Sequence, residues 1–181
     1  NNGTGPMNSL SPRICSISCC RGGLQGVAST SIIHSQGTGQ ITIAGNITGS
    51  GGLTKNGNNT TSFLNLSGTN NYTGTTTISA GVLQVGNGGT TGNLGTGAVI
   101  DNAALVFNRS NALTVGNAIS GTGTLTQSGT GTTILTGTNT YSGTTTLSTG
   151  ILQVGNGGTS GTLGTGAVVN NTHLVFNRSN T

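Results

Sequence analysis

The chain has 181 residues, of which 35 are glycine and only 3% are charged, so it lacks the Ala, Leu, Glu and Lys that build helical bundles. Its net charge of +4 comes from five scattered basic residues, which do not cluster as a nucleic-acid interface would. The hydrophobic content of 30% argues against a wholly disordered chain. No run of about 20 apolar residues occurs, which predicts that this segment does not insert into a membrane.

Residues 1–37 differ in character from the rest of the chain. They hold both prolines, the single methionine and all three cysteines, and they have no counterpart later in the sequence. Cys15, Cys19 and Cys20 match no zinc-binding spacing, so no metal site is expected there. We therefore predict an irregular leader, either poorly ordered or an N-terminal cap, ahead of one domain at 38–181.

That domain consists of two long repeats, 41–112 and 113–181. Residues 67–111 and 136–180 are identical at 33 of 45 positions. The offset between the two copies is constant over this range, so that Tyr72 matches Tyr141 and Gln84 matches Gln153. Upstream the offset is larger by three, which places three extra positions of the first copy near Asn56–Thr61, in a turn. A repeat this long dictates the fold.

Within each repeat, short apolar segments alternate with separators rich in Gly and Asn. Apolar side chains recur at every second position, which is typical of strands with one buried face. In LQV at 83–85 the two apolar residues share one face, and Gln84 is expected on the other. The side chains expected to point inward are Leu83, Val85, Leu105, Phe107, Leu152, Val154, Leu174 and Phe176.

The length of the repeat indicates how the strands are arranged, because it divides into three turns of about 23 to 24 residues, each with three short strands. We therefore predict an all-β fold, a parallel β-helix (β-solenoid), of about six turns across residues 38–181. Columns of like aliphatic residues would then form a continuous core, which suits a chain with 3% aromatic residues.

At residues 68–85, GTNNYTGTTTISAGVLQV, the sequence resembles the autotransporter-associated β-strand repeat of bacterial type V passenger domains. The same pattern returns at 137–154, and an entry of the form LT-K/Q precedes both copies at 53–55 and 125–127. The structural motif residues that carry the resemblance are Tyr72, Gly74, Gly81, Leu83, Gln84, Val85, Tyr141, Gly143, Gly150, Leu152, Gln153 and Val154.

The resemblance implies a right-handed β-helix that serves as a stalk in a secreted passenger, with roles in adhesion and passenger export. It implies display at the cell surface, tethered to the outer membrane of a Gram-negative bacterium. The implied partners are a C-terminal translocator barrel of the parent chain and host or abiotic surface ligands. We also expect the chain to be a piece of a longer array whose uncapped end at Thr181 would associate end to end or aggregate.

Catalysis is not expected, because Asp101 is the only acidic residue and position 101 becomes Asn170 in the second copy. A pair of carboxylates is therefore excluded. A Ser-His-Asp triad would need Asp101 with His34 or His173, and we interpret His173 as a surface residue. No phosphate-binding, dinucleotide-binding or metal-binding motif occurs, so no cofactor is expected.

Repeated polar residues leave an alternative, a module that binds glycan or ice through outward Thr, Asn and Tyr. Arg109 and Arg178 are either a cation ladder for glycan or lipid phosphate, or solvated corner residues that oppose edge aggregation. Tyr72 and Tyr141 either stack on sugars or cover corners of the fold. The TTT rows at 75–77 and 144–146 would lie three turns apart, roughly 14 Å, which is too sparse for an ice-binding array.

Overall fold

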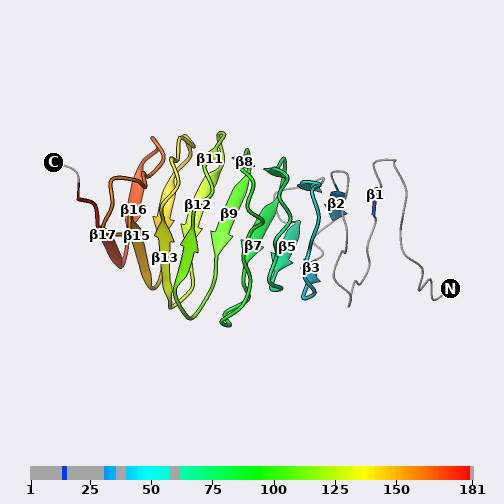
Figure 1. Ribbon diagram of the computed structural model, residues 1–181, viewed down its shortest axis with the longest axis horizontal. Helices are drawn as coiled ribbons and strands as arrows, with labels where there is room; N and C mark the ends of the chain where they lie inside the picture. Colours follow the sequence, from blue (N-terminus) through cyan, green and yellow to red (C-terminus); the bar gives the residue numbers. More distant parts are fainter. Residues whose placement is uncertain (1–13, 16–30, 36–39, 58–61, 180–181) are drawn as a thin grey trace.

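The computed structural model describes residues 14–15, 31–35, 40–57 and 62–179, which form an elongated all-β solenoid (Figure 1). Within these ranges there is no helix, and every pair of hydrogen-bonded strands is parallel. The predicted fold class is thereby confirmed. Cys19 and Cys20 lie outside the described residues, as do the positions 58–61 of the predicted insertion.

The strands stack into three sheets that run along the solenoid. The first sheet holds, in order, β1 (Ile14–Cys15), β2 (Ser31–Ser35), β4 (Leu53–Gly57), β6 (Thr76–Ile78), β8 (Val99–Asp101) and β11 (Ile119–Ser120). The second holds β3 (Gln40–Ile43), β5 (Phe63–Leu66), β7 (Val82–Val85), β9 (Ala104–Phe107), β12 (Thr124–Gln127), β14 (Thr145–Leu147) and β16 (Val168–Asn170). The third holds β10 (Leu113–Val115), β13 (Thr132–Leu135), β15 (Ile151–Val154) and β17 (His173–Phe176).

The first sheet reaches back beyond the expected start of the domain, because β2 pairs with β4 along its whole length. The division at residue 38 stays a prediction, since the side chains of residues 1–39 are not among those described.

Most turns of the solenoid are shorter than the sequence led us to expect. Phe63 pairs with Val82 and Ala104 pairs with Thr124, so the chain returns to the second sheet several positions early at these steps. Only some steps reach the expected length, such as that from Gln40 to Phe63. The expectation was wrong because one repeat does not correspond to three whole turns.

The second copy of the repeat is rotated about the axis by one sheet relative to the first. Three turns carry the chain from Leu83 through Leu105 and Leu125 to Thr145, all in the second sheet. Leu152, the counterpart of Leu83, comes one strand later, in the third sheet. Likewise β4 and β6 belong to the first sheet, and their counterparts β12 and β14 belong to the second. A repeat therefore spans three full turns of the solenoid and one further side of the next turn.

This rotation separates surface features that would otherwise have been stacked. The TTT row at 75–77 overlaps β6 in the first sheet, and the row at 144–146 overlaps β14 in the second. The two rows do not lie above one another on one side, so the distance of three turns expected between them does not apply. An ice-binding face made of these rows has no support in this geometry.

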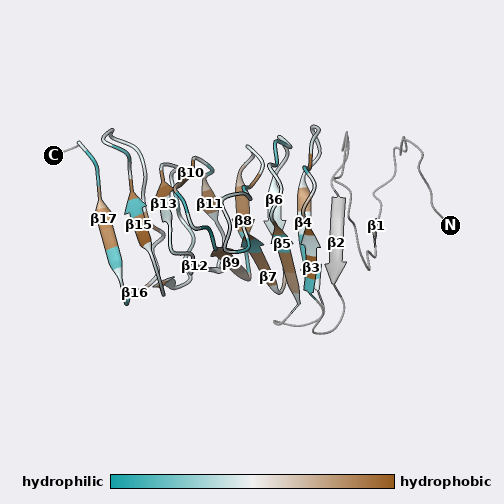
Figure 2. Cartoon of the chain, turned by 90° about the horizontal axis from the view of Figure 1, so that it is seen from below, coloured by the Kyte–Doolittle hydropathy of each residue, from teal (hydrophilic) through white to brown (hydrophobic). Residues whose placement is uncertain are grey.

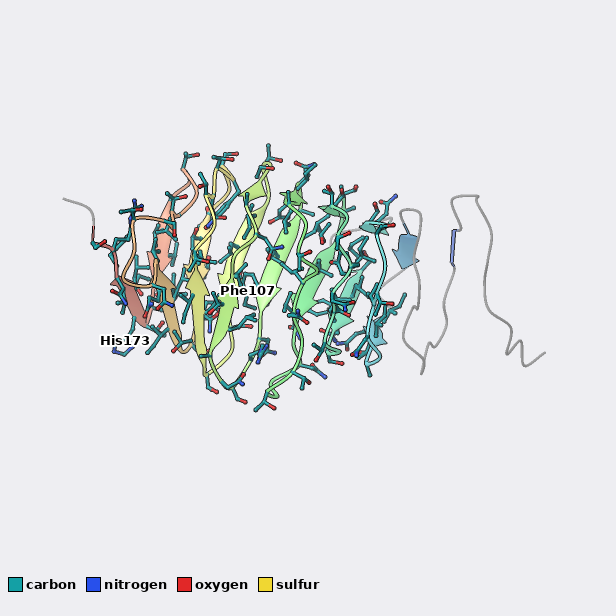
Figure 3. All side chains as sticks on the ribbon, in the orientation of Figure 1. Phe107 and His173 are labelled. Atoms are coloured by element: carbon teal, nitrogen blue, oxygen red, sulfur yellow. The ribbon has the colours of Figure 1, made fainter. Side chains whose placement is uncertain are left out.

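The core consists of columns in which each side chain packs on those one turn away. Leu64, Leu83, Leu105 and Leu125 are in register in the second sheet, and all four are fully buried. Figure 2 shows apolar stretches on the strands, and Figure 3 places Phe107 in the middle of the stack. Val85, Phe107, Leu152 and Val154 are also buried, which confirms these inward predictions.

The prediction that Leu174 and Phe176 are buried in the core is not met on β17. Phe176 is in register with the buried Val154, yet it is 64% exposed, and Leu174 is only partly buried. The reason is positional: β17 is the last strand of the third sheet among the described residues, so its side chains are packed from one side only.

Replacement of Leu83 by Asp tests the core assignment. The carboxylate would enter a dry aliphatic column without a partner, and we expect a loss of several kcal/mol in the free energy of unfolding, measured with urea. Val169→Asp is the matched control, because Val169 is 45% exposed and should tolerate the charge. Equal unfolding midpoints for the two variants would show that Leu83 does not face the core.

Candidate functional site

The predicted motif residues form two equivalent groups, one in each repeat, rather than a single pocket. Each group runs from a buried Tyr, through a TTT strand and a corner Gly, to the LQV strand. Because the repeats are rotated by one sheet, the first group lies on β6 and β7 and the second on β14 and β15. We therefore describe each corner with its counterpart.

Both tyrosines are fully buried inside the solenoid, so neither can stack on a sugar. The Tyr72 hydroxyl shares a hydrogen bond of 2.6 Å with Thr76 Oγ1, and the Tyr141 hydroxyl shares one of 2.7 Å with Thr145 Oγ1. Burial raises the pKa of both phenols. Gly95 packs against the Tyr72 ring so closely that a Cβ at this position would overlap it. The tyrosines thus have the structural role that was one of the two predictions, although they pack inside the solenoid rather than covering a corner.

Buried Asn side chains join successive turns next to these tyrosines. Asn70 Oδ1 accepts from the backbone N–H of Ile47 at 2.9 Å, one turn before it. Its Nδ2 donates to the carbonyl of Asn93 at 2.7 Å, one turn after it. In the second copy, Asn139 makes the equivalent bonds to Ile119 N–H and to the Thr162 carbonyl. Each amide therefore satisfies backbone groups that the strand ladders do not reach.

The motif glycines lie where two turns of backbone meet. A Cβ on Gly74 would overlap the backbone of Gly51 and Gly52, and one on Gly143 would overlap Gly123. Gly81 and Gly150 have φ of +76° and +67°, a conformation that L side chains rarely adopt. A Cβ on Gly150 would also overlap the carbonyl oxygens at Gly129 and Gly131.

Lys55 is a structural side chain whose buried position the sequence did not reveal. It is fully buried, and its Nζ donates to the Asn56 carbonyl at 2.9 Å, to Ser62 Oγ at 2.9 Å and to the Ala80 carbonyl at 3.2 Å. Burial lowers the pKa of this amine from 10.5 to about 8. The ammonium thus binds the corner at the end of β4 to the corner before β7.

Gln127 occupies the counterpart of Lys55 and also donates to corner carbonyls, at 2.8 Å to Gly129 and 3.2 Å to Gly131. Its Oε1 accepts from Thr133 Oγ1 at 2.7 Å. The signal in the sequence was the exchange of Lys for Gln at the entry motif. Such an exchange keeps a hydrogen-bond donor and discards the charge, which indicates a buried donor rather than a surface cation.

Gln84 was expected to point outward, but it is only 7% exposed. Its Nε2 donates to the carbonyl of Gly86 at 2.8 Å, and Gln153 donates to Gly155 at the same distance. The side chain is covered because it folds back onto the loop that follows its own strand. It therefore fixes the start of that loop.

A comparison with protein-family models gives a match to the passenger-associated-transport-repeat at residues 53–85 and 125–154. The two matched segments lie one in each copy of the repeat. Each match begins at the entry motif on β4 or β12 and ends with the LQV strand, so it encloses the corner group just described. The recognition made from the sequence is confirmed. Neither the search of curated proteins nor the search of solved structures finds a match.

Beyond the LQV strand of each matched segment, a loop is held by an arginine. Arg109 Nη1 donates to the Gly92 carbonyl at 2.7 Å, and Arg178 Nη1 donates to the Gly161 carbonyl at 2.6 Å. A second nitrogen of each guanidinium reaches the carbonyl of Thr90 or Thr159. The arginines are therefore loop clamps, a role that the sequence analysis did not predict.

Asp101 is fully buried, and its Oδ1 accepts from the Ala103 N–H at 3.1 Å. Its Oδ2 has no hydrogen-bond partner among the described residues. Burial raises the pKa of the carboxyl group from 3.8 to about 6, against the opposing effect of the Ala103 hydrogen bond. Asp101 is in register with Ile78, which is in register with Lys55, so the two buried charges are separated by one turn of aliphatic packing.

Asp101 and His173 lie in different sheets, Asp101 on β8 in the first sheet and His173 on β17 in the third. His173 is exposed on β17, as expected, near one end of the stack in Figure 3. Among the described residues, no group of three or more His, Cys, Asp or Glu side chains could hold a metal ion. The same residues include no helix that is long and apolar enough to cross a membrane.

Alanine substitutions of two glycines separate steric crowding from backbone strain. Gly150 and Gly157 both have positive φ, but a Cβ on Gly157 would meet nothing within 4 Å. We expect Gly157→Ala to cost roughly 1 kcal/mol, and Gly150→Ala to cost several kcal/mol because the Gly129 and Gly131 backbone must move. Urea unfolding of both variants measures the difference. Similar losses would show that the turns do not touch at Gly150.

The second repeat supplies neutral replacements for both buried charges, Asp101→Asn and Lys55→Gln. The raised pKa of Asp101 means that its stabilising effect is complete below pH 3.8 and is lost as the pH rises through about 6, on the order of 2–3 kcal/mol. The lowered pKa of Lys55 has the opposite effect on stability. The unfolding free energy should rise between about pH 8, where the buried amine loses its proton, and pH 10.5.

Unfolding free energies measured from pH 3 to 11 test both assignments. Asp101→Asn should remove only the fall in unfolding free energy between pH 3.8 and about 6. Lys55→Gln should remove only the rise in unfolding free energy between about pH 8 and 10.5. The same pH profile in the parent and in Asp101→Asn would mean that the carboxyl group is solvated.

Proposed function

We propose that this chain is a stalk segment of a secreted autotransporter passenger that is displayed on the bacterial surface and supports adhesion and export, without catalysis. The observation that carries the proposal is the coincidence of both family matches with the corner groups that join one turn to the next. These residues are used in holding turns together, and their side chains are buried. A stalk needs such contacts, whereas an enzyme needs exposed groups that converge.

Export is supported by the local character of the fold. Each strand pairs only with the strands one turn before and one turn after it, so turns can be added one at a time as the chain emerges. The repeats contain no cysteine, so this assembly needs no disulfide. The proposed partner in export is the translocator barrel of the parent chain.

Adhesion would then use outward side chains or other parts of the parent passenger. The outward surface offers many hydroxyl and amide groups and few charges, which suits contact with neutral or weakly charged surfaces. Host and abiotic surfaces are both consistent with this proposal as ligands.

The export role is tested in the parent autotransporter expressed in a Gram-negative host. The double variant Gly81→Ala/Gly150→Ala should reduce the amount of passenger accessible to external protease on intact cells. Gly157→Ala, with a Cβ in open space, should be displayed like the parent. If the double variant unfolds more easily in urea but is displayed in full, turn-by-turn folding of these repeats does not drive export.

A further inference from the structure

The third sheet begins inside the stack rather than at its end. Its first strand is β10, which pairs with β13 on one side, while the turn before it contributes no strand to this sheet. On the same side of the solenoid, residues 90–96 form an irregular segment. This is a consequence of the rotated repeat, because β10 lies in the third sheet whereas its counterpart in the first copy, β3, lies in the second. A free strand edge thus lies in mid-stack.

Backbone hydrogen bonds join the two turns on both sides of this edge but not at the edge itself. Ser110 N–H donates to Gly89 at 2.9 Å before β10, and Val99 N–H donates to Ala118 at 2.9 Å after it. Between residues 90–96 and 113–116, both inside the described part of the chain, no backbone bond is made. The amide of Asn117 bridges to the carbonyls of Gly95 and Gly97 at 2.8 and 2.6 Å.

A cleft of about 330 Å³ occupies this gap, with walls formed by residues 93–96 and 113–117. The volume lies at the small end of ligand sites and suits a few residues of extended chain. Its lining carries apolar side chains, hydroxyls and amides, and none of the lining residues is charged or aromatic. The ligand that matches this lining is therefore neutral.

The pairing register identifies the backbone groups that face the cleft. The Val115 carbonyl accepts from Thr136 N–H of the next turn, so Val115 bonds toward β13. In a parallel ladder, alternate residues of a strand bond to opposite sides. The N–H and C=O of Thr114 therefore point away from β13, toward the cleft. The Thr114 side chain is exposed, whereas those of Leu113 and Val115 are buried.

We propose that this cleft binds an uncharged extended peptide segment of a partner protein, which adds to the third sheet as the strand before β10. A row of strand N–H and C=O groups is recognised by the complementary row of another strand, and the site would extend an existing parallel sheet. A sugar would instead favour an aromatic platform, and both tyrosines are buried elsewhere. The inference goes beyond the stalk function, since it assigns the segment a partner.

The test uses the full chain and a fluorescent, end-blocked peptide of sequence Gln-Ile-Thr-Ile-Ala-Gly, which is that of residues 40–45. Saturable binding to the parent chain is expected. Thr114→Pro removes the N–H that faces the cleft while leaving the bonds to β13, since Pro is tolerated on strand edges. It should weaken binding about tenfold. Thr114→Ala keeps the N–H and should bind like the parent.

A second pair of variants covers the case in which Thr114→Pro does not fold. A Cβ on Gly116 would meet only Thr136 Oγ1, at 3.7 Å, so the position has room for a side chain. Gly116→Phe should fill the cleft and abolish binding, whereas Gly116→Ala should retain it. Loss of binding in Thr114→Ala to the same degree as in Thr114→Pro, displacement of the peptide by a neutral trisaccharide, or absence of saturable binding would each overturn the proposal.

Discussion

Successive turns of this solenoid meet backbone to backbone at their corners, and this close approach decides which residues the repeat must keep. A Cβ at Gly74, Gly81 or their counterparts would overlap main-chain or corner atoms of the neighbouring turn. Where the turns approach this closely, the strand ladders end and backbone groups must find other partners. Asn70, Lys55 and Gln84 supply them by side-chain hydrogen bonds. The close approach of the turns therefore requires both glycine at the contact and buried side-chain hydrogen-bond donors beside it.

The rotation of the repeat follows from the same corners. The segment around Asn70 and Tyr72 spans a full side of the solenoid without forming a strand, so a repeat contains more sides than it has strands. We call it the NxY segment, residues 70–72 in the first copy and 139–141 in the second. In the first copy it lies on the side of the third sheet, before that sheet's first strand. In the second copy it lies on the side of the first sheet, beyond that sheet's last strand. Features fixed to the repeat thus wind around the axis instead of lining up along it. The Arg-clamped loops, TTT strands and LQV strands all follow this winding.

Much of the fold could be predicted from the sequence, because period-2 alternation and a long repeat determine strands, parallel stacking and the inward residues of the LQV strand. The turn length could not, because alternation reports only sides that are strands and does not count the side formed by the NxY segment. The burial of Lys55 and Gln84 could not be predicted, because a polar residue is expected to be exposed unless its hydrogen-bond partners are known. Phe176 shows the converse, since the burial of an apolar residue in a stack depends on the turn beyond it.

The two copies also differ in the side chains that make hydrogen bonds at equivalent positions. These differences show which substitutions the fold tolerates. Lys55 is replaced by Gln127, and Asp101 by Asn170, so each neutral residue keeps a hydrogen bond to nearby backbone without placing a charge there. Burial of an unpaired charge costs stability, and the solenoid accepts it in the first copy because many turn-to-turn hydrogen bonds surround each site. The corner therefore selects for a donor or acceptor of the right reach, and its charge is a secondary property. This explains why a chain with so few ionisable residues can place two of them in its core.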